Sequence, residues 1–218
     1  MDLPNEILLI IFSYLSFEEM FKGPWKVCKR WRNLTRYPSS LDLSWLGRTH
    51  NPKAILKLLD KQKTNQIILQ NCYINEVICS KIIKKFTFCK KLSLKKMYAP
   101  WSSFLCIPHL TRLKVFEVED NYVFSNFHLI FITSSCIEIE IINLINCRNI
   151  SDYGLALLGK YCKKLKEIDI SYNQKITLLA VDLLIQDCKD LRKITLVGTK
   201  LKICDEFKES FKNIKFVD

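Results

Sequence analysis

The dominant pattern in the chain is a pair of apolar residues at alternate positions, which recurs seven times at a nearly constant interval. Successive pairs begin 26, 25, 24, 26, 26 and 26 residues apart. Side chains at alternate positions of an extended backbone lie on one face, so each pair predicts a short strand with one buried face. The pairs are Leu41/Leu43, Ile67/Leu69, Leu92/Leu94, Phe116/Val118, Ile142/Leu144, Ile168/Ile170 and Ile194/Leu196.

A second position recurs three residues after each pair and most often holds Cys or a small polar residue. It is occupied by Leu46, Cys72, Met97, Asn121, Cys147, Asn173 and Thr199. A period in the twenties with an L-x-L core followed by Asn or Cys is the pattern of a leucine-rich repeat. We therefore predict an α/β solenoid, a short leucine-rich-repeat horseshoe of about seven repeats whose parallel strands form the concave face.

The segments between the pairs predict helices on the opposite side of the solenoid. Residues 136–161 align without a gap with residues 162–187. In this alignment Ser151 and Thr177 stand at helix N-caps, where a hydroxyl accepts free backbone N–H groups. Each of these helices should end near a repeated cysteine.

The other connecting segments are less regular. We expect helices over 51–59 and about 77–86 from their start signals and apolar spacing. Over 99–109 we expect a loop or a 3₁₀ turn, because two prolines disfavour an α-helix there. The repeats then span 41–201, and residues 202–218 predict a C-terminal cap with a helix at 205–212 and a last strand at Ile214/Phe216.

The first forty residues do not follow the repeat. Pro4 and Glu6 favour the start of a helix, and every residue from Ile7 to Phe12 is apolar. A helix that packs on one neighbour shows a single apolar stripe, so this one has too many apolar side chains for a module of its size. Each one left in water costs about 1.5–3 kcal/mol. Either the first repeat covers them or a partner does, and we favour a docking surface. After the turn at Gly23 we expect a second helix from Pro24 to about Leu34.

Ten cysteines raise the question of disulfides or a zinc site, and their positions disfavour both. No C-x-x-C occurs, and the three histidines stand at no zinc spacing. Instead Cys136, Cys162 and Cys188 lie 26 residues apart, as expected of buried free thiols in one repeated position. We expect no metal, no cofactor and a reducing compartment, the cytoplasm or the nucleus.

The formal charge is +12, spread along the repeats in basic pairs. Solvated repeat edges explain this distribution better than a phosphate-binding stripe, because the chain lacks an arginine-rich arm or an aromatic and basic module. The apolar N-terminal segment lacks the flanks of a signal peptide, and no stretch approaches the ~20 apolar residues of a membrane span. We therefore expect a soluble protein with no membrane among its partners, and we disfavour nucleic acid as a partner.

No catalytic constellation is found in the sequence. There is no Gly-rich phosphate loop, no H-E-x-x-H and no Cys paired by position with a His. We expect that the chain is not an enzyme and has no catalytic residue.

Residues that flank the buried pairs should point onto the concave face. This face has an acidic middle with lysines beside it and a few apolar anchors of the kind that dominate binding energy. It is either an idle, solvated surface or a binding surface whose acidic middle favours a basic segment of a partner. The candidate binding residues are Trp45, Lys95, Lys96, Glu117, Glu119, Asp120, Ile141, Ile145, Asp169 and Tyr172.

Two parts of the chain resemble known families. The spacing C-x-x-L-x-x-I-x-I-x-x-N-x-x-I-T at 162–177 resembles the cysteine-containing leucine-rich repeats. Residues 1–40, with Leu3-Pro4, Ile7-Leu8, Ile11-Phe12 and Leu15 followed by Val27-Cys28-Lys29 and Trp31, resemble an F-box. A small all-α F-box followed by such repeats is the layout of the F-box/leucine-rich-repeat family.

The resemblance implies a function. In that family the F-box binds a Skp-family adaptor, which joins it to a cullin–RING ubiquitin ligase, and the repeats select the protein that is ubiquitinated for proteasomal degradation. Phe12 and Trp31 could instead serve the F-box's own core. The residues that would meet the adaptor are Leu3, Pro4, Ile7, Leu8, Ile11, Leu15, Met20, Val27, Cys28 and Trp31.

Three functions therefore remain open, and the first is favoured. The chain is a substrate-recognition subunit of an SCF (Skp–cullin–F-box) ubiquitin ligase, a leucine-rich-repeat scaffold whose F-box works without a cullin, or a basic protein associated with nucleic acid. Co-purification of a cullin separates the first two. Binding that falls steeply with salt would mark the third.

Overall fold

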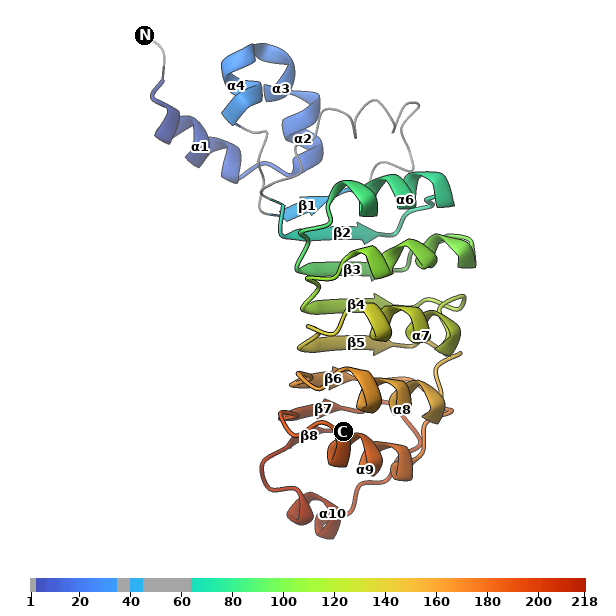
Figure 1. Ribbon diagram of the computed structural model, residues 1–218. Helices are drawn as coiled ribbons and strands as arrows, with labels where there is room; N and C mark the ends of the chain where they lie inside the picture. The colour runs from blue at the N-terminus through green and yellow to red at the C-terminus, as the bar shows by residue number, and fades with distance from the viewer. Residues whose placement is uncertain (1–2, 35–39, 45–63) are drawn as a thin grey trace.

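The computed structural model describes residues 3–34, 40–44 and 64–218. These residues form a small helical module at the N-terminus, followed by a solenoid of parallel strands backed by helices (Figure 1). The expected helix over 51–59, Leu46 and Trp45 lie outside the described residues. The structure thus confirms the predicted fold class, an α/β solenoid with a parallel sheet.

In the described part of the chain the strands form one eight-stranded sheet in strict sequence order, each parallel to the next. The fourteen residues of the seven predicted pairs are all at most 2% exposed, so the period-two pattern identified the buried face correctly. The strands are β1 (Ser40–Asp42), β2 (Gln66–Gln70), β3 (Lys91–Lys95), β4 (Val115–Glu119), β5 (Ile141–Ile145), β6 (Glu167–Asp169), β7 (Lys193–Thr195) and β8 (Lys215–Val217).

Helices cover one face of the sheet (Figure 1). A 3₁₀-helix stands where two prolines predicted a loop or a 3₁₀ turn, with Pro100 at its N-cap and Pro108 within it. Ser151 and Thr177 are N-cap residues as expected, and Thr177 Oγ1 accepts from the Ala180 N–H at 3.4 Å. The helices are α6 (Glu76–Lys85), η2 (Trp101–His109), α7 (Asn126–Ser135), α8 (Asp152–Tyr161) and α9 (Leu178–Asp187).

The Ser151 side chain acts differently from a simple cap. It makes no hydrogen bond to its own helix. Its Oγ accepts from Asn126 Nδ2 at 2.7 Å, and its backbone N–H donates to Asn126 Oδ1 at 3.2 Å. Ser151 therefore joins the starts of α7 and α8.

Every strand from β2 to β7 is followed by a residue in the left-handed region of φ. These six residues occupy one repeated position, with φ between 48° and 65°. The side chain at the recurring Asn or Cys position then turns inward, as Asn173 does when its Nδ2 donates to the Leu144 carbonyl of the preceding repeat at 2.6 Å. The left-handed residues are Asn71, Lys96, Asp120, Asn146, Tyr172 and Gly198.

The C-terminal residues close the solenoid. Helix α10 (Asp205–Ser210) begins at the expected residue and ends two residues before the expected position, and β8 adds a last strand that pairs with β7. The ring of Phe207 meets those of Phe211 and Phe216 at centroid distances of 5.1 and 5.8 Å. These partly buried rings pack against the last part of the core.

The N-terminal module consists of α1 (Asn5–Ser13), α2 (Phe17–Lys22), α3 (Pro24–Val27) and α4 (Lys29–Leu34). A helix does restart at Pro24, but the expected continuous helix to Leu34 is wrong, because Cys28 is extended with φ −158° and ψ 169°. The corner is closed by reciprocal bonds: Trp25 Nε1 donates to the Arg32 carbonyl at 2.9 Å, and Arg32 Nε donates to the Trp25 carbonyl at 3.1 Å.

Trp25 also joins the module to the repeats. Its side chain is buried in the hydrophobic core that continues through the strands, and the partly buried Met20 and Phe21 pack against that core. Leu8 and Phe12 of α1 are buried outside this core. The module is therefore attached through α2 and α3, while the buried side chains of α1 pack within the module.

Candidate functional site

Helix α1 carries two apolar stripes with different surroundings. Leu8, Phe12 and Leu15 follow one another at i, i+4 and i+7, and this stripe faces the module, with Leu8 and Phe12 buried and Leu15 half-buried. The second stripe also has helical spacing and is open to solvent. We call it the α1 face: Ile7 (43% exposed), Ile10 (54%), Ile11 (44%) and Tyr14 (84%).

The α1 face is not needed for the packing of α1 within the module. A helix with a single neighbour needs only one buried stripe, which Leu8 and Phe12 already supply. Leu3 and Leu9 add to the exposed apolar surface. These apolar side chains are exposed in the structure.

The start of α1 is held in place by α4. Arg30 Nε donates to Asn5 Oδ1 at 2.9 Å, and Arg30 Nη2 donates to the Leu3 carbonyl. On the inner side, the Phe12 and Trp31 rings meet edge to face at 5.2 Å. The α1 face therefore rests on a defined support.

The structure divides the ten predicted adaptor residues into two groups. Leu3, Pro4, Ile7, Ile11, Val27 and Cys28 are exposed. The other four contribute wholly or partly to intramolecular packing: Leu8 is 1% exposed, and Leu15, Met20 and Trp31 are half-buried. The sequence prediction omitted Leu9, Ile10 and Tyr14, although the i, i+3, i+4, i+7 spacing from Ile7 was available as a signal for Ile10 and Tyr14.

The second surface is the open face of the sheet. Its middle row runs across the strands as Asp42, Ile68, Ser93, Glu117, Asn143, Asp169, Thr195 and Val217. Of the predicted binding residues, Lys95, Glu117, Glu119, Ile141, Ile145 and Asp169 are partly exposed strand residues. Lys96, Asp120 and Tyr172 lie in the left-handed turns just beyond the strands, so they form the rim of the face.

The carboxylates in the acidic middle of this face form ion pairs with lysines. Lys91 Nζ lies 2.8 Å from Glu117 Oε1, and Lys95 Nζ lies 3.2 Å from Glu119 Oε2. At the rim Lys96 Nζ lies 3.6 Å from Asp120 Oδ2. Each carboxylate of the predicted acidic patch therefore faces a lysine of β3 or the turn after it, and the patch is electrically mixed. Such partly exposed pairs contribute little to stability, about 0–1 kcal/mol each.

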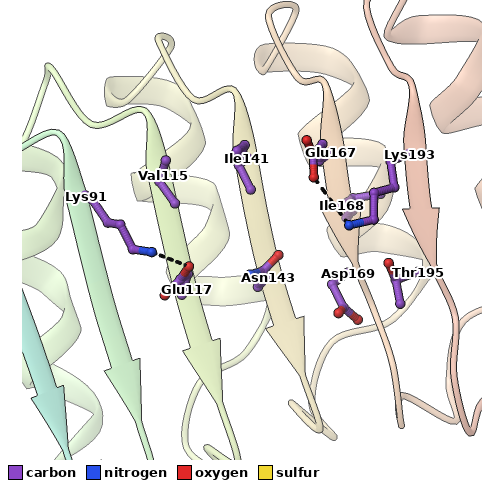
Figure 2. A pocket seen from close by; sticks show the side chains of 10 residues that line it. All are labelled: Lys91, Val115, Glu117, Ile141, Asn143, Glu167, Ile168, Asp169, Lys193 and Thr195. Carbon is purple, nitrogen blue, oxygen red and sulfur yellow. Dashed lines mark ion pairs between the residues drawn. The ribbon is translucent and has the colours of Figure 1, made fainter. Parts of the chain in front are cut away.

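A shallow hollow of about 310 Å³ lies on the face between β3 and β7. Part of its lining is apolar, since Val115 and Ile141 stand side by side on neighbouring strands (Figure 2). Two ion pairs border it, Lys91 with Glu117 and Lys193 with Glu167. The lining residues are Lys91, Val115, Glu117, Ile141, Asn143, Glu167, Ile168, Asp169, Lys193 and Thr195.

The cysteines are structural in this fold. All ten are free thiols, and only Cys28 and Cys204 are exposed. Burial raises the pKa of Cys136, Cys147 and Cys162 to about 12, which keeps these thiols protonated and unreactive. Within the described ranges no cluster of His, Cys, Asp or Glu is arranged to hold a metal ion. None of the described helices is both long and apolar enough for a membrane span.

Comparisons with known proteins identify the N-terminal module and the fold. Residues 1–41 match the F-box-like family. Among solved structures the chain is similar to the yeast complex of Rad7 and Elc1, with a TM-score of 0.51 and 13% identity over 82% of this chain and 52% of that chain. The chain thus spans about half the length of that relative, and the likeness shows the fold alone.

Two further solved structures have lower TM-scores. The TLR13–ssRNA13 complex has a TM-score of 0.49 and 17% identity over 82% of this chain and 32% of that chain. Internalin InlF from Listeria monocytogenes str. 4b F2365 has a TM-score of 0.45 and 12% identity over 82% of this chain and 66% of that chain. A search of curated proteins gave no match. The chain is an α/β solenoid with an F-box-like domain at residues 1–41.

Proposed function

We propose that this chain is the substrate-recognition subunit of an SCF-type ubiquitin ligase. The F-box-like domain docks on a Skp-family adaptor through the α1 face, and the concave face of the repeats holds the protein to be ubiquitinated. The observation that carries this proposal is the open Ile7, Ile10, Ile11 and Tyr14 stripe within the segment that matches the F-box-like family.

The size of the α1 face fits a docking role. Burying a large apolar side chain fully contributes about 1.5–3 kcal/mol, and these four are between 43% and 84% exposed, so about 1 kcal/mol each remains to be gained. A few such side chains at the centre of an interface are enough to dominate its binding energy. The support from Arg30 keeps the ordering cost of docking low.

Other parts of the proposal follow from the repeats. The chain itself is non-catalytic, and the ubiquitin chemistry belongs to other subunits. The repeats are of the cysteine-containing type, which is supported by the buried series Cys136, Cys162 and Cys188 at the ends of α7, α8 and α9. Eight buried free thiols fit the cytoplasm or the nucleus, where thiols stay reduced.

Co-expression with a Skp-family adaptor and a cullin tests the proposal. The full chain should retain both proteins through purification, and Ile7→Asp combined with Ile11→Asp should remove both. Leu179→Asp, on the exposed side of α9, is the matched control and should retain them. Leu8→Asp is unsuitable, because Leu8 is buried and the change would unfold the module.

The outcomes distinguish a ligase subunit from a scaffold that works without a cullin. If the adaptor is retained without the cullin, the chain is a scaffold with a cullin-independent F-box and not a ligase subunit. Equal retention of the adaptor by the wild-type chain and the Ile7→Asp/Ile11→Asp variant would refute docking through the α1 face.

A further inference from the structure

We propose that the hollow between β3 and β7 binds an extended substrate segment in which a lysine or arginine stands two or three residues from an aliphatic residue. The cation meets Asp169, and the aliphatic side chain rests on Val115 and Ile141. This inference rests on the proposed function, because it names the class of substrate that the concave face selects.

Asp169 is distinguished from the other acids of the hollow by its surroundings. Glu117 and Glu167 each have a lysine partner, whereas Asp169 has no ion pair within the described part of the chain. Its Oδ1 accepts from the Ser171 N–H at 2.9 Å, and no bond to Oδ2 is found among the described residues. Its neighbours across the sheet are the neutral Asn143 and Thr195. Asp169 thus presents a carboxylate that has no ion-pair partner among the described residues.

The apolar part of the hollow begins one strand across from Asp169, on β5. Val115 and Ile141 are paired across β4 and β5 and are partly exposed (Figure 2). The ion pairs at either side occupy the charged groups that would otherwise compete for a ligand. A ligand therefore finds a small apolar floor with a single free carboxylate beside it.

The spacing of these features fits an extended peptide. Ile141 is aligned with Glu167, so Asp169 is one strand across and two residues along from Ile141. With strands about 4.8 Å apart and a rise of about 3.3 Å per residue, the two backbone positions are separated by about 8 Å. An extended chain covers about 8 Å in two to three residues. An aliphatic residue and a basic residue at that separation can reach both features together.

The net charge of +12 does not prevent a basic segment from binding in the hollow. At physiological ionic strength charges are screened beyond about 8 Å, so the groups within the hollow decide the local preference. The positive excess slows the approach of a basic protein, while the free carboxylate selects which segment stays bound.

A peptide-binding experiment tests the proposal directly. The full chain, purified with its adaptor, is applied to an array of random twelve-residue peptides. The wild-type chain should enrich peptides with Lys or Arg two or three residues from Ile, Leu or Val. Asp169→Asn keeps the acceptor for the Ser171 N–H and should weaken binding of these peptides about tenfold, as expected for loss of a bond to a charged group. Asp169→Lys should select peptides with Asp or Glu at the basic position.

The control is Asp182→Lys, which makes the same change in charge on helix α9 and should leave the peptide preference unchanged. No basic enrichment by the wild-type chain, or the same enrichment by Asp169→Lys, would overturn the inference. Adaptor retention is measured on the same samples. Loss of the adaptor from the wild-type chain would refute the proposed function, whereas an intact complex without peptide selection would refute only the role of Asp169.

Discussion

At the scale of single residues, the turn after each strand from β2 to β7 contains a residue with a left-handed backbone conformation. Six residues in this position adopt a left-handed conformation, and only the last is glycine. At Gly198 a second constraint adds to φ, because a Cβ atom would lie 2.4 Å from the ring of Tyr172. The sequence pattern placed this row on the concave face, and backbone conformation instead places it on the rim. Periodicity identified the row, but the left-handed turn is a property that side-chain polarity alone does not reveal.

Gly198→Ala should therefore destabilise the solenoid by about 2–4 kcal/mol, from the left-handed conformation and from overpacking against Tyr172. Urea-induced unfolding followed by circular dichroism measures the change. In a Tyr172→Ala background the same substitution should cost less, since the ring is absent. An equal loss in both backgrounds would show that the ring contact has no part in the effect.

At the scale of elements, the sequence predicted most of what local patterns control. The strands, the 3₁₀ segment after Pro100 and the helix restart at Pro24 follow from alternation and proline geometry. The break at Cys28 depends on reciprocal bonds between Trp25 and Arg32, which local propensity does not encode. The ion pairs of the sheet face depend on the register between neighbouring strands. Aligning the repeats would have placed Lys91 beside the strand of Glu117, so the mixed charge of the face was open to prediction.

Interactions between repeats give the protein an acid-sensitive contact. Lys114 and Lys166 both bond to Glu140 and lower the pKa of its carboxyl from 4.5 to about 2. The folded state therefore binds the proton less tightly than the unfolded state, so this contact stabilises the protein above pH 4.5 and is lost as pH falls towards 2. Glu140→Gln should flatten the pH dependence of the unfolding free energy between these values. An unchanged slope would show that the contact is absent in solution.

The start of α7 depends on a histidine. His128 Nδ1 accepts from the Ser125 N–H at 3.1 Å, and Nε2 donates to the Trp101 carbonyl at 3.0 Å, which ties α7 to η2. Burial lowers the pKa of His128, consistent with a neutral ring. His128→Ala should cost about 2–4 kcal/mol through lost bonds and a cavity, measured by urea unfolding. His109→Ala, at an exposed site, is the control, and equal losses would contradict this role.

At the scale of the whole molecule, the two surfaces lie on different units. The module is attached to the solenoid through Trp25, so the α1 face and the concave face belong to one structure but use different residues. Variants of one surface should leave binding at the other intact. The run of apolar residues from Ile7 to Phe12 favoured an uncovered helix, because a short module cannot bury two stripes of one helix. It did not separate the buried Leu8 from the exposed Ile10, since that division depends on how α1 lies on α4.

Site-specific photo-crosslinking at Ile10 tests the central claim most directly. A photoreactive amino acid is placed at Ile10, or at Leu179 as the control, in the full chain co-expressed with a Skp-family adaptor. Ile10 should crosslink to the adaptor and Leu179 should not. A crosslink from Ile10 to the chain's own repeats, or no crosslink to the adaptor in a complex that contains it, would contradict the account.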